Sequence, residues 1–431
     1  MTWTRPRPNT GLMRLLGVLN RAVLLHGLPL LRRIPGLRDL PFVRGYFRVR
    51  AMEIPADDFR RLEAAVNPGT VAFLGPNHPE FGADWLVDKE ISTWVAPRMA
   101  AWADRGIIAA APRFFGMNNL VANDGGEAAR EYSVEQALAG HGVLLHPEGT
   151  VRWTNDVVHP LFGGIAQMAL AAAARTDRPV FIVPLVWKYQ FVGDVSAQLD
   201  AEMRHVERSL GLRVGRGLDI PLRFTALQCG ILKRQMERFE YIDRAPDDDF
   251  FRRQSVFQAF LIHSLEQRYD VERSDDTDKY IARLARAVRA ELTASRGDTT
   301  AGAANRRALL ERDVAMTEEA KRLGEFARAT YGTPMLTQEQ VSESLKRIRD
   351  RLLRRGWKNT LANMLPRPLG PRVVHVAVPE VIAIPSSGDA PRESELLATA
   401  RARMQAALDD INVRIAPDVQ RFAHRNPFAM D

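Results

Sequence analysis

The sequence predicts an α/β fold: a mostly parallel sheet flanked by helices, with a large all-helical insertion before the last strand. Short apolar runs at Val71–Leu74, Val143–Leu145 and Pro179–Val186 are separated by stretches with a helical spacing of apolar residues. This alternation is typical of parallel strands joined by helical crossovers. From about residue 190 to residue 370 the chain is rich in charge and lacks strand signals. We expect that part to form a series of helices.

The other elements follow from apolar periodicity and from glycine and proline breaks. In the core we expect a strand at Tyr46–Met52 and helices at Asp57–Ala65, Ile91–Arg105 and Glu127–Ala139. In the insertion we expect helices at Ser196–Leu210, Leu222–Phe239, Phe250–Arg268, Asp278–Ala294, Asn305–Tyr331 and Gln338–Arg355. After a linker at Pro366–Pro371, we expect a last strand at Val373–Ile384 and a helix at Ser394–Asn412. The predicted domains are 1–45 (membrane association), 46–190 (core), 191–370 (helical insertion) and 371–431 (return to the core).

The composition narrows the classes of function. Of 431 residues, 46% are hydrophobic, as in a globular protein. The single cysteine, Cys229, predicts a reducing compartment, and its apolar neighbours favour an inert buried thiol. The nine histidines show no metal-binding spacing, so no metal site is expected. The net charge of +8 suggests an anionic partner, and because aromatic residues are not clustered among the basic ones, lipid headgroups are favoured over nucleic acid.

Residues 1–45 combine basic and apolar side chains. The first 50 residues hold ten arginines and one acidic residue, Asp39. Two apolar runs, Leu12–Leu19 and Ala22–Leu31, are shorter than the roughly 20 uninterrupted residues that a membrane-spanning helix needs. We interpret the segment as a basic amphipathic anchor that holds the protein peripherally at the cytoplasmic face of an anionic membrane. The alternative is two helices packed on the core with their arginines in solvent.

A histidine follows the first strand of the predicted core. The run Val71–Leu74 breaks at Gly75–Pro76 and is followed by Asn77 and His78, after which a helical spacing begins. Loops at the carboxyl ends of parallel strands frame the crevice where ligands bind. Asp84 is close enough through one helical turn to hold the imidazole in one tautomer while its other nitrogen takes a proton. The alternative is a helix-start histidine followed by an ordinary first-turn acid.

The second strand has the same construction. Val143–Leu145 is followed by His146, which we expect to line the site rather than to act as a second base, and then by the polar turn Glu148–Thr150. Further on, Gly163 and Gly164 begin an alanine-rich helix. Backbone N–H groups at such a helix start suit an anion or a phosphate.

Four ordered blocks carry a family resemblance. NHPEFGAD, HPEGT, PLFGGIAQMAL and RPVFIVPLV, in this order and at these separations, resemble the successive blocks of the glycerolipid acyltransferases, the lysophosphatidic acid and glycerol-3-phosphate acyltransferase family. The resemblance covers about residues 45–190, with a return near 371–384. It implies that His78 is the general base that deprotonates an acceptor hydroxyl for attack on an acyl thioester, and that Asp84 orients it.

The resemblance also implies the substrates. The acyl donor is expected to be acyl-CoA or acyl carrier protein, acting as co-substrate, with no other cofactor, and the acceptor to be a lysophospholipid or a related lipid alcohol. The Glu-Gly-Thr turn matches the block that binds the acceptor. The predicted substrate-binding residues are Asn77, Glu148, Gly149, Thr150, Arg152, Gly163 and Gly164.

The chain departs from the family pattern in the first block. Five residues rather than the family's four separate His78 from Asp84. One extra residue turns a helix by about 100°. The pairing therefore requires the turn at Gly82 to absorb that rotation, and Glu80 and Asp88 are the alternative partners.

Two further departures concern the acceptor. Val151 intervenes between the Glu-Gly-Thr turn and Arg152, whereas the family usually has an arginine directly after the turn. The family's second block, with an arginine for the acceptor phosphate, should fall within Ile107–Gly126. There Asn118–Asn119 or Asn123–Asp124 takes the arginine position. The acceptor need not be a simple glycerol phosphate.

Together these observations predict an O-acyltransferase of the phospholipid-biosynthesis type, peripheral on a membrane, with His78 as its base. The alternative is a catalytically inactive lipid-binding or scaffold protein that retains the acyltransferase fold. A side chain of Asp84 that points away from His78 would favour this alternative.

Overall fold

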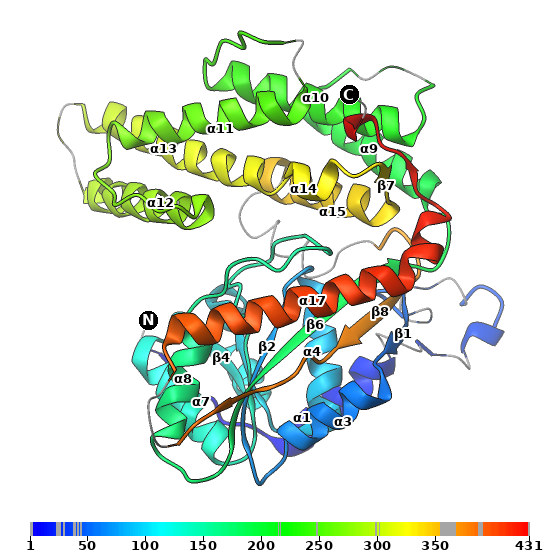
Figure 1. Ribbon diagram of the computed structural model, residues 1–431, viewed down its shortest axis with the longest axis vertical. Helices are drawn as coiled ribbons and strands as arrows, with labels where there is room; N and C mark the ends of the chain where they lie inside the picture. The colour runs from blue at the N-terminus through cyan, green and yellow to red at the C-terminus, as the bar shows by residue number, and fades with distance from the viewer. Residues whose placement is uncertain are drawn as a thin grey trace. The chain divides into compact units, whose positions relative to one another are not determined.

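The chain forms two compact units (Figure 1). The sheet unit comprises Met1–Val195 and Trp357–Phe422, and the helical unit comprises Ser196–Gly356 and Ala423–Asp431. The computed structural model describes residues 3–22, 27–28, 31–37, 40, 43, 45–213, 215, 217–246, 249–297, 300, 302–353, 368–386 and 391–429.

The sheet unit is built on an eight-stranded sheet in which the strand order is β1-β8-β6-β2-β5-β3-β4, and β9 also pairs with β6. The strands are β1 (Val49–Glu53), β2 (Val71–Pro76), β3 (Ala100–Ala103), β4 (Leu120–Ala122), β5 (Val143–Leu144), β6 (Val180–Phe191), β8 (Arg372–Ala377) and β9 (Ile382–Ile384). Neighbouring strands from β6 to β4 are parallel, whereas β8 and β9 run antiparallel to β6. The predicted α/β class with a mostly parallel sheet is confirmed.

Helices cover both faces of this sheet because its central strands are apolar on both sides. The helices of this unit are α1 (Thr10–Arg21), α3 (Ala56–Ala65), α4 (Gly82–Val95), α5 (Arg105–Ala110), α6 (Pro112–Met117), α7 (Gly126–Leu138), α8 (Gly164–Ala173) and α17 (Glu393–Gln420). From β2, Val71 and Phe73 pack in a core with α7, α8 and α17, while Ala72 and Leu74 pack in a second core with α3 and α4. Figure 1 shows α17 lying along one face of the sheet.

Several boundaries differ from the prediction. The helix expected at Ile91–Arg105 is wrong beyond Val95, because Ala96 precedes a proline and is extended, and the chain then forms β3. Neither β3 nor β4 was expected, since both are short and β3 is rich in alanine. The strand β6 continues past the predicted end at Val186 to Phe191. The last strand, predicted as one, is divided into β8 and β9 around Pro379, which has no N–H to donate.

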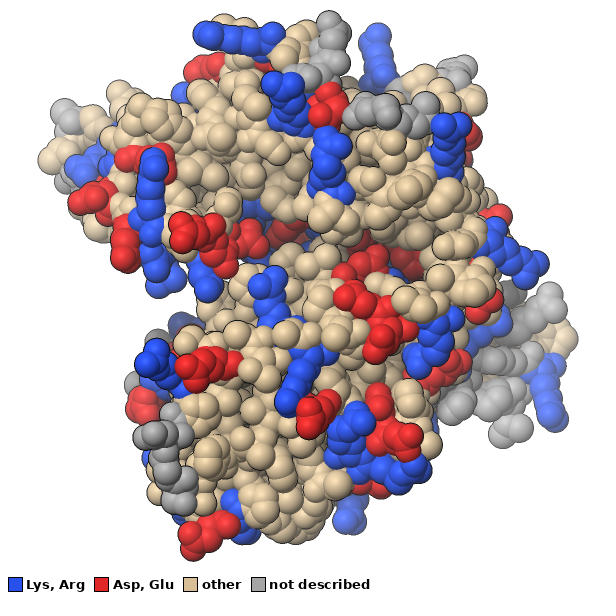
Figure 2. All heavy atoms as spheres, in the orientation of Figure 1, with Lys and Arg blue, Asp and Glu red and all other residues tan. Residues whose placement is uncertain are grey.

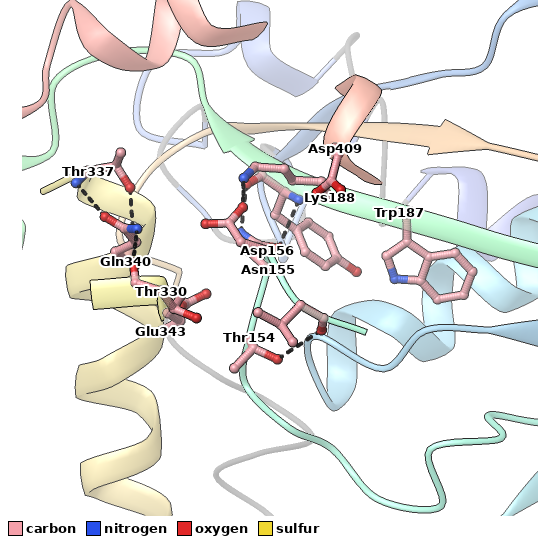
Figure 3. A network of polar contacts seen from close by, with 12 residues as sticks. Thr154, Asn155, Asp156, Trp187, Lys188, Thr330, Thr337, Gln340, Glu343 and Asp409 are labelled. Carbon is pink, nitrogen blue, oxygen red and sulfur yellow. Dashed lines mark hydrogen bonds and ion pairs between the residues drawn. The ribbon is translucent and has the colours of Figure 1, made fainter. Parts of the chain in front are cut away.

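The helical unit consists mainly of helices that lie between β6 and β8 in the chain. They are α9 (Ser196–Leu210), α10 (Ile220–Arg238), α11 (Phe250–Glu266), α12 (Thr277–Ala294), α13 (Ala303–Gly324), α14 (Arg328–Tyr331) and α15 (Gln338–Ile348). Thr337 and Gln340 exchange hydrogen bonds in a capping box that starts α15 (Figure 3).

The prediction of an all-helical insertion is wrong in one detail. Met335–Leu336 (β7) pairs antiparallel with His424–Arg425 (β10) from the end of the chain. The side chain of Asn426 donates hydrogen bonds to the carbonyls of Tyr331 and Thr333, at 2.7 Å each. These contacts, together with the burial of Phe428, explain why Ala423–Asp431 belongs to the helical unit rather than returning to the core as predicted.

Parts of some predictions fall outside the described residues. These are most of the apolar run Ala22–Leu31, the acidic residue Asp39, the last two residues of the helix expected at Gln338–Arg355, and the first two of the linker Pro366–Pro371. Within the described part of the chain, no helix combines the length and the apolar character needed to cross a membrane.

Candidate active site

His78 and Asp84 meet at the carboxyl end of β2. Nδ1 of His78 lies 2.8 Å from Oδ2 of Asp84. The helix α4 begins at Gly82, so that Pro79 to Phe81 form a turn and Asp84 falls in the first helical turn. The same Oδ2 accepts a 2.7 Å hydrogen bond from the backbone N–H of Glu80, which ties this turn to the helix. The extra residue expected between His78 and Asp84 therefore lies in this turn, before the helix starts, and it does not rotate Asp84 away from His78.

The carboxylate of Asp84 is fully buried and is surrounded by donors. Its Oδ1 accepts hydrogen bonds from Trp187 Nε1 at 2.9 Å and from the Tyr189 hydroxyl at 2.7 Å. Trp187 and Tyr189 are two residues apart on β6, so both side chains point to the same face of the sheet. Burial raises the pKa of Asp84 well above its usual value, whereas the charge of His146 and the hydrogen bonds from Tyr189, Trp187 and Glu80 act in the opposite direction. Four donors around two oxygens match the acceptor capacity of a carboxylate. Asp84 is thus positioned to hold His78 with Nδ1–H donating and Nε2 able to accept a proton.

Two asparagines hold the part of β6 that carries these donors. The strand pairing of β2 with β6 ends at Pro76 and Leu185. Beyond it, the Asn77 side chain accepts from the N–H of Trp187 at 2.9 Å and donates to its carbonyl at 3.0 Å. The Asn155 side chain makes the same pair of contacts with the backbone of Tyr189, at 3.2 Å and 2.9 Å. The two amides continue the hydrogen-bond ladder after the strand has ended.

These contacts give Asn77 a structural role. Asn77 is almost fully buried, and its side-chain amide is engaged by the backbone of Trp187, so it supports the site. Its contact with a substrate stays a prediction. Next to Asn155, Asp156 forms a partly buried ion pair with Lys188 (Figure 3). Lys188 lies between Trp187 and Tyr189 in β6, so its side chain points to the opposite face of the sheet.

Arg372, a buried arginine on β8, packs against the ring of Tyr189. Arg372 donates a 2.6 Å hydrogen bond to the carboxylate of Glu80, and its guanidinium lies 4.6 Å from the centre of the Tyr189 ring. Glu80, an alternative partner for His78 in the sequence, therefore pairs with Arg372 instead. Arg372 neutralises a second carboxylate close to Asp84 and fixes the ring whose hydroxyl donates to it.

His146 stacks on His78. The two ring centres are 3.9 Å apart and the ring planes differ by 13°. Nε2 of His146 lies 2.9 Å from Oδ2 of Asp88, and Nδ1 lies 2.8 Å from the backbone carbonyl of Asn77. Asp88 is one helical turn beyond Asp84, so α4 presents one carboxylate to each histidine.

The protonation states of the two rings differ. Burial, and secondly the charge of His146, lower the pKa of His78 well below its usual value, although the backbone of Glu80 acts in the opposite direction. Burial also acts to lower the pKa of His146, but the charge and hydrogen bond of Asp88 outweigh it and raise that pKa to about 9. Near neutral pH, His78 is a neutral ring that can accept a proton.

Glu148 lies beside the two histidines, His78 and His146. It is 1% exposed, and neither carboxylate oxygen has a partner in the described part of the chain. Burial raises its pKa to about 7, whereas the charges of Arg152 and His146 and the backbone N–H groups of His78 and His159 oppose that shift. The loop reaches His78 directly, because the N–H of Arg152 donates to the His78 carbonyl at 3.2 Å. An orphaned carboxyl at this position can accept hydrogen bonds from a ligand hydroxyl.

Arg152, Gly149 and Thr150 lie on the same loop as Glu148. Arg152 is 7% exposed, and its Nε has no partner among the described groups. Gly149 has a φ of +71°, and an added Cβ would come within 2.7 Å of the Phe162 ring, so the turn depends on glycine here. Thr150 is exposed. The structure thus brings the predicted Glu-Gly-Thr turn and the shifted arginine close to His78.

The side chain of Glu393 lies close to Gly163 at the start of α8. A Cβ added to Gly163 would lie 1.7 Å from Oε1 of Glu393, and the other oxygen of Glu393 accepts a 3.0 Å hydrogen bond from Gln167. The carboxylate of Glu393 from α17 therefore lies beside the helix start that the sequence suggested for a substrate anion.

The asparagines at the missing arginine position have structural contacts. Asn119 has a φ of +60° and receives a hydrogen bond from the buried Tyr132 hydroxyl. The Asn118 side chain accepts a hydrogen bond from Lys89 at 3.3 Å. After β4, Asp124 pairs at 2.7 Å with Arg105, the first residue of the helix α5 that follows β3. Arg105 is thus an arginine at the carboxyl edge of the sheet. It follows β3, the strand that neighbours β4.

Sequence reasoning missed Trp187, Tyr189, Arg372 and the role of Asp88 as the partner of His146. The available signals were the alternation of large side chains in the sequence that continues the third strand and the spacing of Asp84 and Asp88 by one helical turn.

The comparisons with protein-family models and with curated proteins find no match to this chain. No group of three or more His, Cys, Asp or Glu side chains in the described ranges is arranged so that it could hold a metal ion.

Proposed function

We propose that this protein is an O-acyltransferase that moves a fatty acyl group from an acyl thioester to a hydroxyl of a lysophospholipid or related lipid acceptor. The observation that carries the proposal is the 2.8 Å contact between Nδ1 of His78 and the buried Asp84, at the end of a strand in a parallel sheet. The ordered motifs that resemble the glycerolipid acyltransferases supply the reaction class. Acyl-CoA or acyl carrier protein is the donor.

The chemistry follows from the orientation of His78. Asp84 holds Nδ1–H, so Nε2 removes the proton of the acceptor hydroxyl as its oxygen attacks the thioester carbonyl carbon. A C–O bond forms and the C–S bond breaks. The proton on Nε2 then goes to the departing thiolate, which leaves as a thiol and restores neutral His78. While His78 carries the proton, the Asp84 carboxylate stabilises its charge.

Glu148 and Arg152 are the proposed acceptor contacts. Among the described residues, the Glu148 carboxylate oxygens have no hydrogen-bond partner, and the Arg152 guanidinium has no carboxylate within ion-pair distance. The buried carboxyl accepts from a second hydroxyl of the lipid backbone, and the buried guanidinium suits a phosphate oxygen. This arrangement supports an acceptor with a hydroxyl and a phosphoester group close together.

The proposed site of action is the cytoplasmic surface of an anionic membrane. The helix α1 packs on α4 through Asn20, which donates to the Leu86 carbonyl at 2.9 Å, and through the ion pair of Arg21 with Glu90. Its outer side exposes Leu15 and Val18, at 55% and 68%. On the face shown in Figure 2, Lys and Arg side chains alternate with Asp and Glu rather than gathering in one basic patch. That view gives no support to a nucleic-acid partner.

The test is transfer of labelled acyl groups from acyl-CoA and from acyl carrier protein to a panel of lysolipids and other lipid alcohols. His78→Ala should lower the transfer rate ~10²-fold or more, and Asp84→Ala should also lower it. His263→Ala, a substitution of an exposed histidine on α11, serves as the matched control and should keep wild-type activity.

The rival function is a catalytically inactive lipid-binding or scaffold protein. The contact of Asp84 with His78 supports the enzyme over this rival. Absence of transfer for every donor and acceptor pair, in folded protein that binds vesicles, would reverse that preference. Equal rates for wild type and His78→Ala would remove His78 as the base.

A further inference from the structure

The proposed reaction uses one of two stacked histidines and gives the other no task. His146 follows β5, whereas His78 follows β2, and their rings lie 3.9 Å apart and nearly parallel. The His146 ring also packs against the Trp187 ring in a T-shaped arrangement, with a centroid distance of 5.7 Å and an interplanar angle of 90°. The His146 ring is therefore confined on one face by the proposed base and also by the strand that supports Asp84.

The contacts of His146 identify its charge. Nδ1 lies 2.8 Å from the carbonyl oxygen of Asn77, and Nε2 lies 2.9 Å from the carboxylate of Asp88. A backbone carbonyl and a carboxylate only accept hydrogen bonds, while a neutral imidazole has a single N–H. Only the doubly protonated ring donates to both. The geometry thus describes an imidazolium held by a buried counter-ion.

The charged and titratable groups around His146 come from three elements. From α4, Asp88 is in contact and Asp84 lies farther away, and both favour the cation. Glu148, on the same loop as His146, interacts electrostatically with His146. From the loop after β2, His78 presents its ring face. The carboxylates outweigh the effect of burial, which is why the pKa of His146 rises to about 9.

We propose that His146, held as a cation by Asp88, is a positioning residue that fixes the ring plane of His78 and keeps His78 unprotonated between turnovers. This role of His146 rests on the proposed role of His78 as the base, and it concerns how the protonation of that base is controlled. Two stacked imidazolium rings would repel each other, so a proton that arrives from solvent is disfavoured on His78. His78 is then available as a base at pH values where an ordinary histidine is already protonated.

Two substitutions test the proposal. His146→Gln retains a donor toward Asp88 but has no charge, and Asp88→Asn removes the counter-ion that holds the proton on His146. Each should move the acid limb of the pH profile of kcat/KM to higher pH, by about one unit or more. Because both act through the same charge, the double variant should shift the limb no further than His146→Gln alone. His263→Gln, the same change at an exposed position, should leave the limb in place.

A second readout does not depend on activity. In protein with isotope-labelled histidine, NMR should show both ring nitrogens of His146 protonated at pH 7 and His78 neutral. In His146→Gln the titration midpoint of His78 should rise. A neutral His146 at pH 7, or an unchanged His78 midpoint in both single variants, would overturn the proposal. If either variant does not fold, wild-type spectra still decide the charge of His146.

The outcomes separate this inference from the proposed function. A cationic His146 and a shifted His78 midpoint without acyl transfer would retain the charged stack and reject the acyltransferase. Transfer that depends on His78, with an acid limb that stays in place in both variants, would retain the acyltransferase and reject the role of His146.

Discussion

At the scale of single residues, the hydroxyl of Tyr189 donates a hydrogen bond to Oδ1 of Asp84. Tyr189→Phe keeps the ring but leaves Oδ1 with Trp187 Nε1 as its donor. Hydrogen bonds to charged groups contribute about 1.5–3 kcal/mol. We therefore expect kcat to fall about tenfold or more with KM little changed, because Tyr189 does not contact the proposed substrates.

Tyr132→Phe is the matched control for this experiment. Tyr132 is also buried in the sheet unit, and its hydroxyl donates to the side chain of Asn119, away from His78. Steady-state kinetics of the two variants should differ. Equal losses of kcat in both would mean that Tyr189 acts only through the stability of the fold.

Glu148 provides a prediction about stability and pH. Burial raises its pKa from 4.5 to about 7 in the folded protein. The folded state therefore binds this proton more tightly than the unfolded state, so the stabilisation is complete below pH 4.5 and is lost as the pH rises through 7. The cost at high pH is about 3 kcal/mol. Glu148→Gln should gain free energy of unfolding relative to wild type as the pH goes from 5 to 8.

Urea unfolding at several pH values measures this difference. Glu63→Gln, at an exposed position on α3, should show no comparable trend. A Glu148→Gln variant whose stability parallels the wild type from pH 5 to 8 would show that Glu148 is already ionised at pH 5. The same variant should lose acyl transfer, because an amide neither carries the charge nor accepts hydrogen bonds at both positions.

The sequence predicted those site residues that are close together in the chain. His78 and Asp84 are within one turn and one helix start, and Glu148 follows a recognisable strand. Trp187 and Arg372 could not be assigned in the same way, because they reach Asp84 and Glu80 through strand pairing across more than 100 residues. Local periodicity contains no information on which distant strand becomes a neighbour.

At the scale of elements, the sequence predicted helices and strands with long apolar patterns. It did not predict elements whose formation depends on packing against a neighbouring element. The limits predicted for α9 agree with the structure, and α12 differs by one residue. The short strands β3 and β4 were missed because four or fewer residues form strands only when a neighbouring strand is present. The length of β6 depends in the same way on β8, which pairs with its second half.

After the strand β10, the side chain of Phe428 packs in the helical unit, and its contribution to stability can be tested. Phe428, which is 7% exposed, packs against the rings of Phe250, Phe251 and Phe326 with centroid distances of 4.9–5.7 Å. Phe428→Ala should lower the free energy of unfolding of this unit by about 3 kcal/mol or more. Ile242→Ala, at a residue that is 77% exposed in the same unit, is the control.

Chemical denaturation together with hydrogen exchange of the β7 amides would measure the loss. Faster exchange at β7 in Phe428→Ala, with little change in Ile242→Ala, is the expected result. Unchanged exchange would mean that the end of the chain does not stabilise the helical unit, despite its pairing with β7.

At the scale of the whole molecule, the net charge of +8 and the exposed apolar side of α1 lead to a prediction about membrane binding. Leu15, Val18 and Leu19 lie at helical spacing on the side of α1 that faces away from α4, and they are 55%, 68% and 49% exposed. Burial of these side chains in the interface adds to the attraction between arginines and anionic headgroups. Binding should therefore have an apolar part and a part that salt weakens.

Replacing all three with serine separates the two parts. The triple variant should bind vesicles of anionic phospholipid at least tenfold more weakly at physiological salt, since each exposed leucine or valine contributes about 1.5–3 kcal/mol when fully buried. Val413→Ser on α17 and Ile242→Ser, both 77% exposed, are controls that lie outside α1. Vesicle sedimentation over a range of salt concentrations measures the effect. Equal binding by the triple variant and wild type would assign membrane association to charge alone, because α1 would then contribute no apolar contact with the lipid.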